Sequence, residues 1–266
     1  MPYFSGFAPI PNPLKDKLLP DGLPFYLARE PKPKAIIICL HGFFATPYEI
    51  RPIANACYDL GIAAIAPLLP CHGYAEITEQ KQAVLDLTLE NMLVAIRQEI
   101  AIARTQYEFV GLYGQSMGGA LALAIASEGL VDAVATTAPA LLLPIWARVP
   151  LFLLGRWKTL YLWNPIALSS YNPSYRFSNA HASKVLQQVS EYSRDRLSQV
   201  SCPVHVAHSH RDRVIDPIVC QWIESQATGK VTIEWFDRSD HTMPLDIQSK
   251  EVSTSVANFF FSEFAG

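Results

Sequence analysis

The sequence predicts an α/β fold with a mostly parallel, doubly wound sheet that carries helices on both faces. Short, continuous apolar runs, which are typical of strands buried on both sides, recur along the chain. Helical patterns separate these runs, and strands that alternate with helices favour a parallel sheet. The chain has 266 residues, of which 50% are hydrophobic and 17% are charged, so it is long and apolar enough to form one large core.

The expected strands follow a proline-rich N-terminal arm. Eight of the 20 prolines lie within residues 1–33, which indicates an extended arm with one edge strand at residues 24–29. The first central strand is expected at Ala35-Ile-Ile-Ile-Cys-Leu40, a continuous apolar run. Similar runs predict strands at residues 62–66, 108–113, 131–137, 204–207 and 231–236.

Helices are expected between these strands. The clearest is amphipathic, with apolar residues at spacings of three and four: Leu85, Leu89, Met92, Leu93, Ile96 and Ile100. Shorter helices are expected at residues 52–60 and 217–226, and a final helix carries Val252, Val256, Phe259 and Phe260.

One long segment does not fit the alternation. Residues 139–200 hold three tryptophans and four tyrosines among several prolines, which indicates an insertion at the C-terminal end of a strand. We therefore predict a core formed by residues 1–138 and 201–266, with residues 139–200 as an inserted cap or lid. The weakly charged stretch at 133–155 is long enough to span a bilayer, but three prolines break it. It favours a core strand followed by an apolar lid segment, with transient contact of the cap with a membrane surface as the less favoured alternative.

Charge and cysteine usage limit the expected partners and compartment. The 21 basic and 24 acidic residues give a net charge of −3, and no basic cluster is present, so no nucleic-acid partner is expected. The five cysteines are scattered without a C-x-x-C pair, and the N-terminus lacks the pattern of a signal peptide. These features predict a reduced, cytoplasmic protein, and they do not specify an oligomeric state.

A G-x-S-x-G turn lies between an expected strand and an apolar helix. The segment reads Phe109-Val-Gly-Leu-Tyr-Gly-Gln-Ser-Met-Gly-Gly119, which is the context that a nucleophile elbow requires. A glycine turn that only packs, or one that binds phosphate, is the alternative. A phosphate loop would need lysine where this chain has Ala120. We therefore predict that Ser116 is a nucleophile.

A serine hydroxyl needs a base to activate it. His241 follows the last expected strand, at the edge of the sheet where Ser116 is also expected. His41 and His72 are also expected near this edge, but they precede Ser116, whereas the chain order of such a fold is Ser, then Asp or Glu, then His. His241 is therefore the predicted base.

The acid that orients the base is expected at the same edge. Asp212 lies just beyond the strand that begins at residue 204, and it precedes His241 in the chain. Its rivals are Asp216, which is expected to cap the following helix, and the loop residues Asp237 and Asp240. Position and order favour Asp212.

Two backbone N–H groups are expected to bind the oxyanion. One belongs to Met117, the residue after the nucleophile. The other is expected in the loop after the first central strand, where Gly42 leaves room for a substrate and Phe43 supplies the N–H.

These motifs together resemble the α/β-hydrolase superfamily, and within it the carboxylesterase and monoacylglycerol-lipase-like group. The resemblance implies Ser116 as nucleophile, His241 as base, Asp212 as acid, and Phe43 and Met117 as oxyanion donors. Two departures are Ala45 and Ser209, where the family usually has glycine. The matching pieces are Leu40-His-Gly-Phe-Phe-Ala-Thr-Pro47, Ala66-Pro-Leu-Leu-Pro-Cys-His-Gly73, Gly114-Gln-Ser-Met-Gly-Gly119, Asp212-Arg-Val-Ile-Asp-Pro217 and Asp240-His-Thr-Met-Pro-Leu-Asp246.

Two hypotheses of another class remain. His208-x-His210-x-Asp212 resembles the start of a zinc site of a metal-dependent hydrolase, although Arg213 stands where that motif continues with histidine. On a strand, His208 and His210 would also share one face, which explains their spacing without a metal. The second hypothesis is a binding protein that keeps the fold without turnover.

The favoured prediction is a serine hydrolase that needs no cofactor or metal. The apolar segments of the expected cap indicate a pocket for a medium or long acyl chain, although such residues also serve to pack a cap onto a core. The expected partner is thus a small-molecule ester or a lipid, and the resemblance implies monoacylglycerol-like esters. A thioesterase, a lactonase or a carbon–carbon hydrolase would use the same triad.

Overall fold

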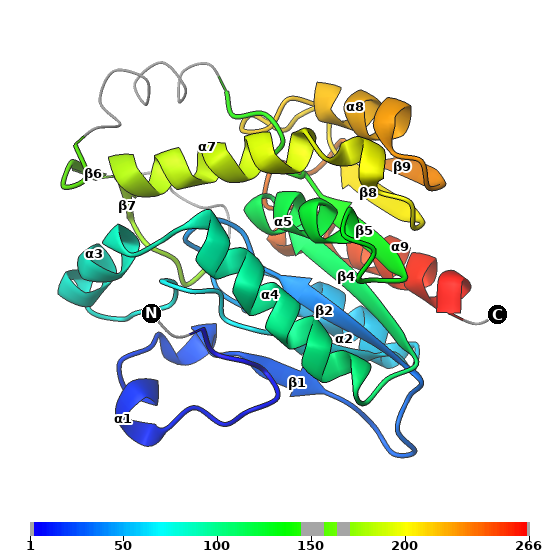
Figure 1. Ribbon diagram of the computed structural model, residues 1–266, viewed down its shortest axis with the longest axis horizontal. Coiled ribbons are helices and arrows are strands. Elements are labelled where there is room, and N and C mark those ends of the chain that lie inside the picture. The colour runs from blue at the N-terminus through cyan, green and yellow to red at the C-terminus, as the bar shows by residue number, and fades with distance from the viewer. Residues whose placement is uncertain (1–2, 145–156, 164–170, 265–266) are drawn as a thin grey trace.

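A computed structural model describes residues 3–144, 157–163 and 171–264 of the chain. Within these residues, seven strands form one sheet in the order β1-β3-β2-β4-β5-β8-β9 (Figure 1). Strand β1 runs antiparallel to β3, and all other neighbours are parallel. The predicted fold class is confirmed. The strands are β1 (Phe25–Leu27), β2 (Ala35–Leu40), β3 (Ala63–Ala66), β4 (Phe109–Gln115), β5 (Ala133–Thr137), β8 (Val204–His208) and β9 (Val231–Trp235).

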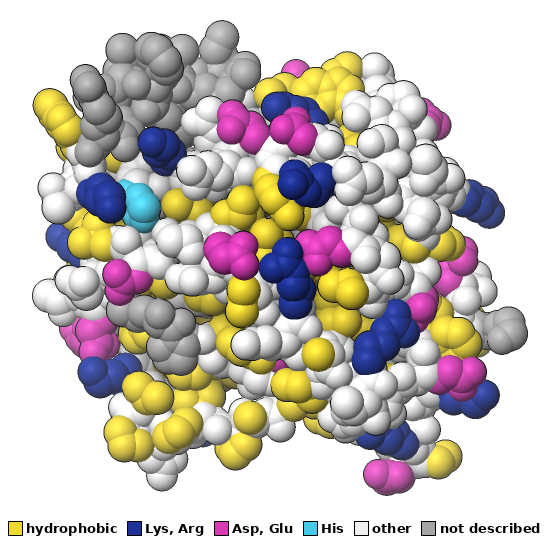
Figure 2. Space-filling view, viewed as in Figure 1, with side chains coloured by type: hydrophobic (Ala, Val, Ile, Leu, Met, Phe, Trp, Pro, Cys, Tyr) yellow, Lys and Arg dark blue, Asp and Glu magenta, His cyan; other side chains and the backbone are white. Residues whose placement is uncertain are grey.

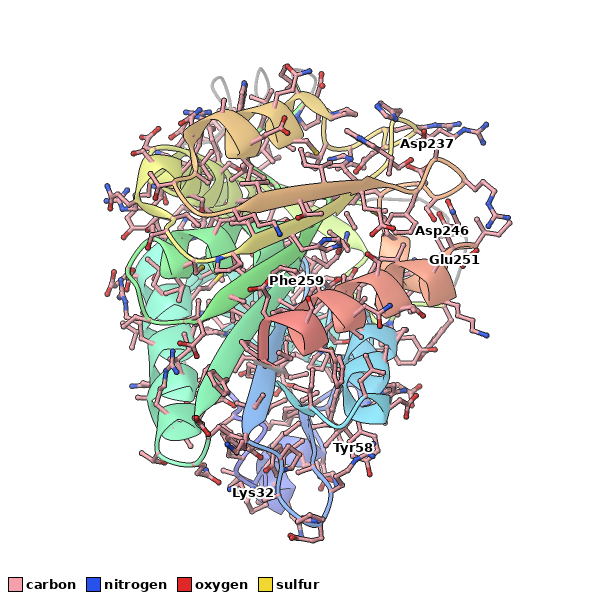
Figure 3. The ribbon with its side chains drawn as sticks, turned by 90° about the vertical axis from the view of Figure 1, so that its right-hand side faces the viewer. Lys32, Tyr58, Asp237, Asp246, Glu251 and Phe259 are labelled. Carbon is pink, nitrogen blue, oxygen red and sulfur yellow. The ribbon has the colours of Figure 1, made fainter. Side chains whose placement is uncertain are left out.

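Helices cover both faces of this sheet. On one face, α2 (Arg51–Asp59) packs beside α9 (Ser249–Phe264), as Figure 3 shows from the side of α9. On the other face lie α4 (Leu89–Arg104), α5 (Met117–Ala126) and α7 (Ala180–Arg194). Every residue of α5 is buried, because this helix is enclosed between the sheet and the outer helix α7. The other helices are α1 (Asn12–Lys15), α3 (Ile77–Leu85) and α8 (Ile218–Gln226).

The long amphipathic helix expected from residue 85 onward begins later than its apolar pattern suggests. Helix α3 ends at Leu85 and α4 begins at Leu89. Thr88 adopts an extended conformation between them, and its hydroxyl accepts the N–H of Asn91 at 3.1 Å. This side chain caps the new helix, so Leu85 and Leu89 belong to two different helices.

The strand order places a crevice at the carboxyl ends of β2 and β4. From β2 the chain moves to β3 on one side, and it then crosses to β4 and β5 on the other. Such a reversal leaves the loops after the two central strands diverging, and ligands of α/β sheets bind there. The loop after β2 and the turn after β4 are the segments in which Phe43 and Ser116 were predicted to act.

The predicted cap is described only in part. Strands β6 (Tyr161–Trp163) and β7 (Phe177–Asn179) pair antiparallel, and α7 packs on α5. The apolar segment at 151–154, on which the expectation of an acyl pocket partly rested, lies outside the described residues. The boundaries of the insertion therefore stay a prediction.

The surface carries both signs of charge. On the face shown in Figure 2, basic and acidic side chains are interspersed. Arg97 forms an ion pair with Glu128 at 2.8 Å, and Arg104 with Asp132 at 2.7 Å. Among the described residues, none of the helices is long and apolar enough to cross a membrane.

The contact between α9 and the sheet predicts a large loss of stability for one substitution. Phe260 is fully buried and packs so closely over Gly111 that a Cβ there would lie 2.7 Å from its ring. We expect Phe260→Ala to lower the free energy of unfolding by about 3–5 kcal/mol, because it leaves a cavity. Its neighbour Phe261 is 49% exposed, so Phe261→Ala should change this value by less than about 0.5 kcal/mol. Urea denaturation measures both, and equal losses would contradict the packing described here.

Candidate active site

A strained turn holds Ser116 between β4 and α5. Its backbone has a φ of 54° and a ψ of −114°, a conformation that residues other than glycine adopt at a cost of about 1–3 kcal/mol. The two flanking glycines make the turn possible. A Cβ at Gly114 would lie 2.1 Å from the carbonyl oxygen of Gly118, and a Cβ at Gly118 would lie 2.3 Å from that of Leu40. Larger residues at either position would push α5 away from the sheet.

The structure brings the three predicted catalytic side chains into one hydrogen-bonded chain. The Oγ of Ser116 lies 2.9 Å from Nε2 of His241, and Nδ1 of His241 lies 2.8 Å from Oδ2 of Asp212. The residues come from the β4–α5 turn, the loop after β9 and the loop after β8. They are up to 125 positions apart in the sequence, and they meet because parallel strands end at one edge.

Asp212 is held as an anion beneath the imidazole. Its side chain is fully buried, and its Oδ1 accepts the N–H groups of Val214 at 2.8 Å and Ile215 at 2.9 Å. Burial alone would raise the pKa of Asp212, but the charge and hydrogen bond of His241 and these two N–H groups outweigh burial and lower it. The carboxylate can thus both orient the ring and stabilise its protonated form.

The surroundings of His241 raise its pKa and so favour the protonated ring. Burial lowers the pKa of His241, but the charge and hydrogen bond of Asp212 outweigh this effect, so the pKa lies above its ordinary value. The ring keeps 17% of its surface exposed. A neutral ring can accept the hydroxyl proton of Ser116, and Asp212 then stabilises the cation that forms.

A buried polar network also fixes the backbone of His241. Gln115, the last residue of β4, donates from Nε2 to the carbonyl oxygen of His241 at 2.8 Å. Its Oε1 accepts from the hydroxyl of Thr137, which in turn lies 2.6 Å from the hydroxyl of Tyr113. Sequence reasoning missed Gln115, although an amide next to the nucleophile, at the end of a buried strand, was a usable signal.

Ser209 joins the two loops that carry Asp212 and His241. Its buried hydroxyl donates to the carbonyl oxygen of Ser239 at 2.7 Å and accepts the N–H of Arg211 at 3.0 Å. The departure from glycine at Ser209 therefore adds a link between the loops. The departure at Ala45 causes no backbone strain, because the residue with a positive φ in that loop is Phe44, at 61°.

The rival acids have other partners. Asp216 accepts the N–H of Ile218 at the start of α8, and the carboxylate of Asp237 contacts His210 on the surface. Asp240 accepts the N–H of His241 at 2.9 Å, so it touches the backbone of the candidate base and not its ring.

The rival bases are engaged as well. Nδ1 of His41 donates to the carbonyl oxygen of Gly42 at 2.9 Å, and its Nε2 accepts the N–H of Leu69 at 3.1 Å. Nδ1 of His72 donates to the carbonyl oxygen of Pro70 at 2.8 Å. Burial holds the pKa of both rings below the ordinary value, so both are neutral supports of the backbone.

The residues of the zinc hypothesis do not converge. Nδ1 of His208 faces the backbone of Ser209, His210 pairs with Asp237 and stacks on Trp235, and Asp212 faces His241. Across residues 3–144, 157–163 and 171–264, no group of three or more His, Cys, Asp or Glu side chains is arranged to hold a metal ion.

The two predicted oxyanion donors lie in the loop after β2 and at the start of α5. The N–H of Met117 is at the first turn of α5, where helical N–H groups have no intrahelical acceptor. Phe43 follows Gly42, whose carbonyl oxygen accepts from His41 at 2.9 Å and from the N–H of Ala45 at 3.2 Å. Both N–H groups therefore stay candidates for the stabilisation of negative charge.

A Ser, a His and an Asp joined by hydrogen bonds at the carboxyl edge of a mostly parallel sheet are the arrangement expected of an α/β hydrolase. Comparison with known proteins agrees with this class. A family model described as the alpha/beta hydrolase family matches residues 37–253. The chain belongs to this family, and the resemblance inferred from the motifs is confirmed.

Similar proteins include lipases. A thermostable monoacylglycerol lipase from Bacillus sp. (strain H-257) is 24% identical over 255 residues, which cover 89% of this chain and 93% of that protein. A solved structure of the metagenome-derived lipolytic enzymes LipS and LipT matches with a TM-score of 0.82 and 20% identity, covering 92% of this chain and 99% of that one. The monoacylglycerol lipase of Paleococcus ferrophilus matches with a TM-score of 0.75 and 17% identity, covering 90% and 98%. The two structural matches show a shared fold.

The geometry of the candidate site predicts a defined pH dependence. Because the pKa of His241 is raised above its ordinary value of 6.5, the acid limb of kcat/KM should have its midpoint above that value, with activity lost as His241 is protonated. Asp212→Asn removes the charge that raises this pKa, so NMR titration should place the pKa of His241 lower in the variant. The variant should also lose about 10⁴-fold in kcat.

Asp216→Asn is the matched control for this prediction. Its carboxylate contacts the start of α8 and not His241, so the pKa of His241 and kcat should stay at their wild-type values. A His241 that titrates identically in all three proteins would contradict the pairing with Asp212.

Proposed function

We propose that this protein is a serine hydrolase that cleaves carboxylic esters through an acyl-enzyme. The observation that carries the proposal is the continuous chain of hydrogen bonds from Ser116 through His241 to Asp212, at 2.9 and 2.8 Å. In this proposal Ser116 is the nucleophile, His241 the general base and Asp212 the group that orients it. The names of the related lipases support an ester as substrate.

The arrangement supports a two-step reaction. The Oγ of Ser116 attacks the ester carbonyl carbon while Nε2 of His241 takes the hydroxyl proton, and the carbonyl oxygen becomes an oxyanion. The tetrahedral intermediate collapses, and His241 passes its proton to the leaving alcohol. Water, activated by the same ring, then attacks the acyl-enzyme, which releases the acid and restores Ser116.

The N–H groups of Phe43 and Met117 would stabilise the oxyanion. They act without reorganisation because the backbone fixes both before the substrate binds. Removing one such donor typically costs about 10²–10³-fold in kcat, so this pair would supply a large part of the rate enhancement.

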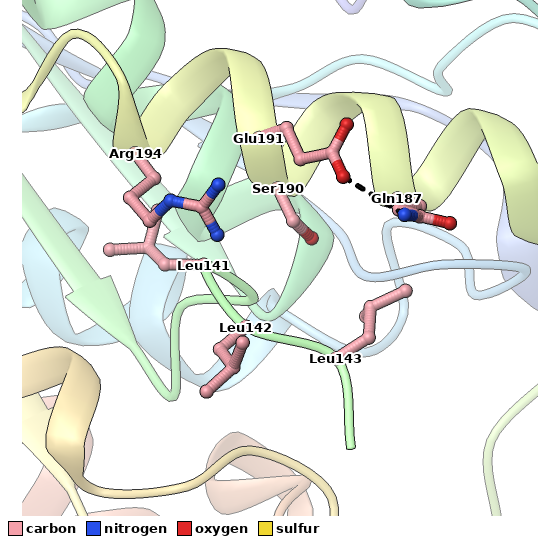
Figure 4. A pocket seen from close by; sticks show the side chains of 7 residues that line it. All are labelled: Leu141, Leu142, Leu143, Gln187, Ser190, Glu191 and Arg194. Atoms are coloured by element: carbon pink, nitrogen blue, oxygen red, sulfur yellow. Dashed lines mark hydrogen bonds between the residues drawn. The ribbon is translucent and has the colours of Figure 1, made fainter. Parts of the chain in front are cut away.

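We further propose a medium or long acyl chain, as in a monoacylglycerol. A pocket of about 140 Å³ lies between α7 and the loop after β5 (Figure 4). Three leucines line one side of it, and Ala140, just before them, donates its N–H to the carbonyl oxygen of Ser116 at 3.0 Å. The other lining residues are polar or charged, so the support for an acyl chain comes from this one wall of leucines and from the names of the related monoacylglycerol lipases. The lining residues are Leu141, Leu142, Leu143, Gln187, Ser190, Glu191 and Arg194.

Hydrolysis of a series of p-nitrophenyl esters, from acetate to palmitate, tests this function. We expect turnover to be highest with the longer acyl chains. EDTA should leave turnover unchanged, because Ser116 supplies the nucleophile. Ser116→Ala should lower kcat by at least about 10⁴-fold, and release of p-nitrophenol measures both effects.

The control is Ser127→Ala, since Ser127 lies at the C-terminal end of α5 and its hydroxyl donates to the carbonyl oxygen of Ala124 at 2.6 Å. This variant should keep wild-type activity. Full activity in Ser116→Ala would contradict the nucleophile, loss with EDTA would favour a metal-dependent reaction, and a preference for acetate would contradict the long acyl chain.

A further inference from the structure

Glu49 is a buried carboxyl group beside the candidate oxyanion loop, which we define as residues 41–46. It lies just before α2 and is 5% exposed. Its Oε2 accepts the N–H of Gly42 at 2.7 Å, and its Oε1 accepts from Nδ2 of Asn172 at 3.1 Å. The mechanism above does not use Glu49, and nothing in the motifs pointed to it.

The contact with Glu49 explains why residue 42 is glycine. A Cβ at Gly42 would lie 2.9 Å from Oε2 of Glu49, so a side chain there would displace the carboxylate. Gly42 is also held from its other side, because its carbonyl oxygen accepts from His41 and from the N–H of Ala45. That carbonyl shares one planar peptide group with the N–H of Phe43. Glu49 holds the preceding peptide group, that of His41 and Gly42, while His41 and Ala45 hold the peptide group of Gly42 and Phe43, so these contacts together set the direction of the Phe43 N–H.

Asn172 extends the contact to a segment within the predicted cap. The same segment makes two further hydrogen bonds to the oxyanion loop. The hydroxyl of Thr46 donates to the carbonyl oxygen of Pro173 at 3.1 Å, and the N–H of Tyr175 donates to the carbonyl oxygen of Phe44 at 3.1 Å. Residues 172–175 thus hold the oxyanion loop directly at two points, and through Glu49 at a third.

We propose that Glu49 is a positioning residue, which fixes the Phe43 N–H for oxyanion binding and ties the oxyanion loop to residues 172–175. The inference rests on the proposed function, because it assigns Glu49 a part in the same site. Glu49 would act through Gly42 and would not touch the substrate.

The energetic cost of Glu49 argues against a role in packing alone. Burial raises the pKa of Glu49, and the N–H of Gly42, the charge of His241 and the amide of Asn172 oppose that rise. A buried charge is costly even when it is hydrogen-bonded, and a hydrophobic residue of similar size often gives equal or greater stability. A buried carboxylate that accepts the N–H of Gly42 is better explained by a need to fix the peptide group of His41 and Gly42.

Kinetics of Glu49 variants on an ester that the wild type hydrolyses test this proposal. Glu49→Ala releases the N–H of Gly42, so kcat should fall about tenfold to a hundredfold, which is less than the loss of a whole oxyanion donor. KM should stay within about twofold, because the oxyanion forms only in the transition state.

Glu49→Gln should restore kcat to within about threefold of the wild type. Its new carbonyl oxygen can accept the N–H of Gly42. Its new NH₂ group can donate to Oδ1 of Asn172 once the Asn172 amide turns over, because Nδ2 faces Glu49 in the wild type and Oδ1 has no partner among the described residues. Asn172→Ala should lower kcat by a smaller factor than Glu49→Ala. It should add little to Glu49→Ala in the double variant, because both remove one connected set of contacts.

Glu99 supplies the matched control. It is another buried carboxylate, and it accepts the N–H of Gly6 and the hydroxyl of Ser5, both at 3.1 Å, on the N-terminal arm. Glu99→Ala should lower the melting temperature and leave kcat unchanged. Glu49→Ala with the same profile, a lower melting temperature and wild-type kcat, would overturn the proposal. So would a Glu49→Gln variant that is as slow as Glu49→Ala.

Two further outcomes are decisive. If Glu49→Ala does not fold, Asn172→Ala carries the test, and wild-type kcat in that variant would overturn the link to residues 172–175. A wild type that hydrolyses no ester would count against the proposed function itself and would overturn this inference with it. If the wild type is active and all the variants hydrolyse the ester at the same rate, the result would count against the role of Glu49 and not against the proposed function.

Discussion

The turn at Ser116 packs against the end of β2 with backbone in contact with backbone, and the rest of the site depends on that approach. Gly118 lies directly under the carbonyl oxygen of Leu40, and Gly114 lies against Gly118. This packing forces Ser116 into a positive φ, directs its side chain toward the crevice and brings the first turn of α5 beside the loop that follows β2. The nucleophile and both candidate oxyanion donors are therefore set by the same contact.

The charge of the site is balanced, and its loops are fixed, by contacts that lie both near and far in the sequence. Asp212 is buried under His241, and the N–H groups of Val214 and Ile215 compensate its charge. Gln115 and Ser209 fix the loops that carry His241 and Asp212. Glu49 holds the loop that carries Phe43 by a hydrogen bond. Since a displacement of about 1 Å can cost about 10²-fold in rate, these contacts would contribute to turnover although they do not touch the substrate.

Sequence reasoning predicted the fold well because burial leaves a strong local signal. Strand β2 was expected at residues 35–40, where all six residues are buried. The start of α4 was misplaced because Thr88 interrupts an apolar pattern, and helix α7 was not expected within the predicted cap. The three catalytic side chains could be predicted because chain order and position at the sheet edge restrict the choice of residues. Glu49 was missed, and Ser209 was noted only as a departure from the family, because their contacts form only in the folded protein. Gln115 bonds to a partner 126 positions away, and its place next to the nucleophile at the end of a buried strand was the only local signal for it.

The central claim is that Ser116 forms a covalent acyl-enzyme with the help of His241. The most direct measurement is rapid quenching of the reaction with a p-nitrophenyl ester, followed by mass spectrometry of the digested protein. The account predicts one acyl group on the peptide that contains Ser116, formed at the rate of the p-nitrophenol burst and absent in His241→Ala. An acyl group on another residue, or full turnover with none bound, would contradict it.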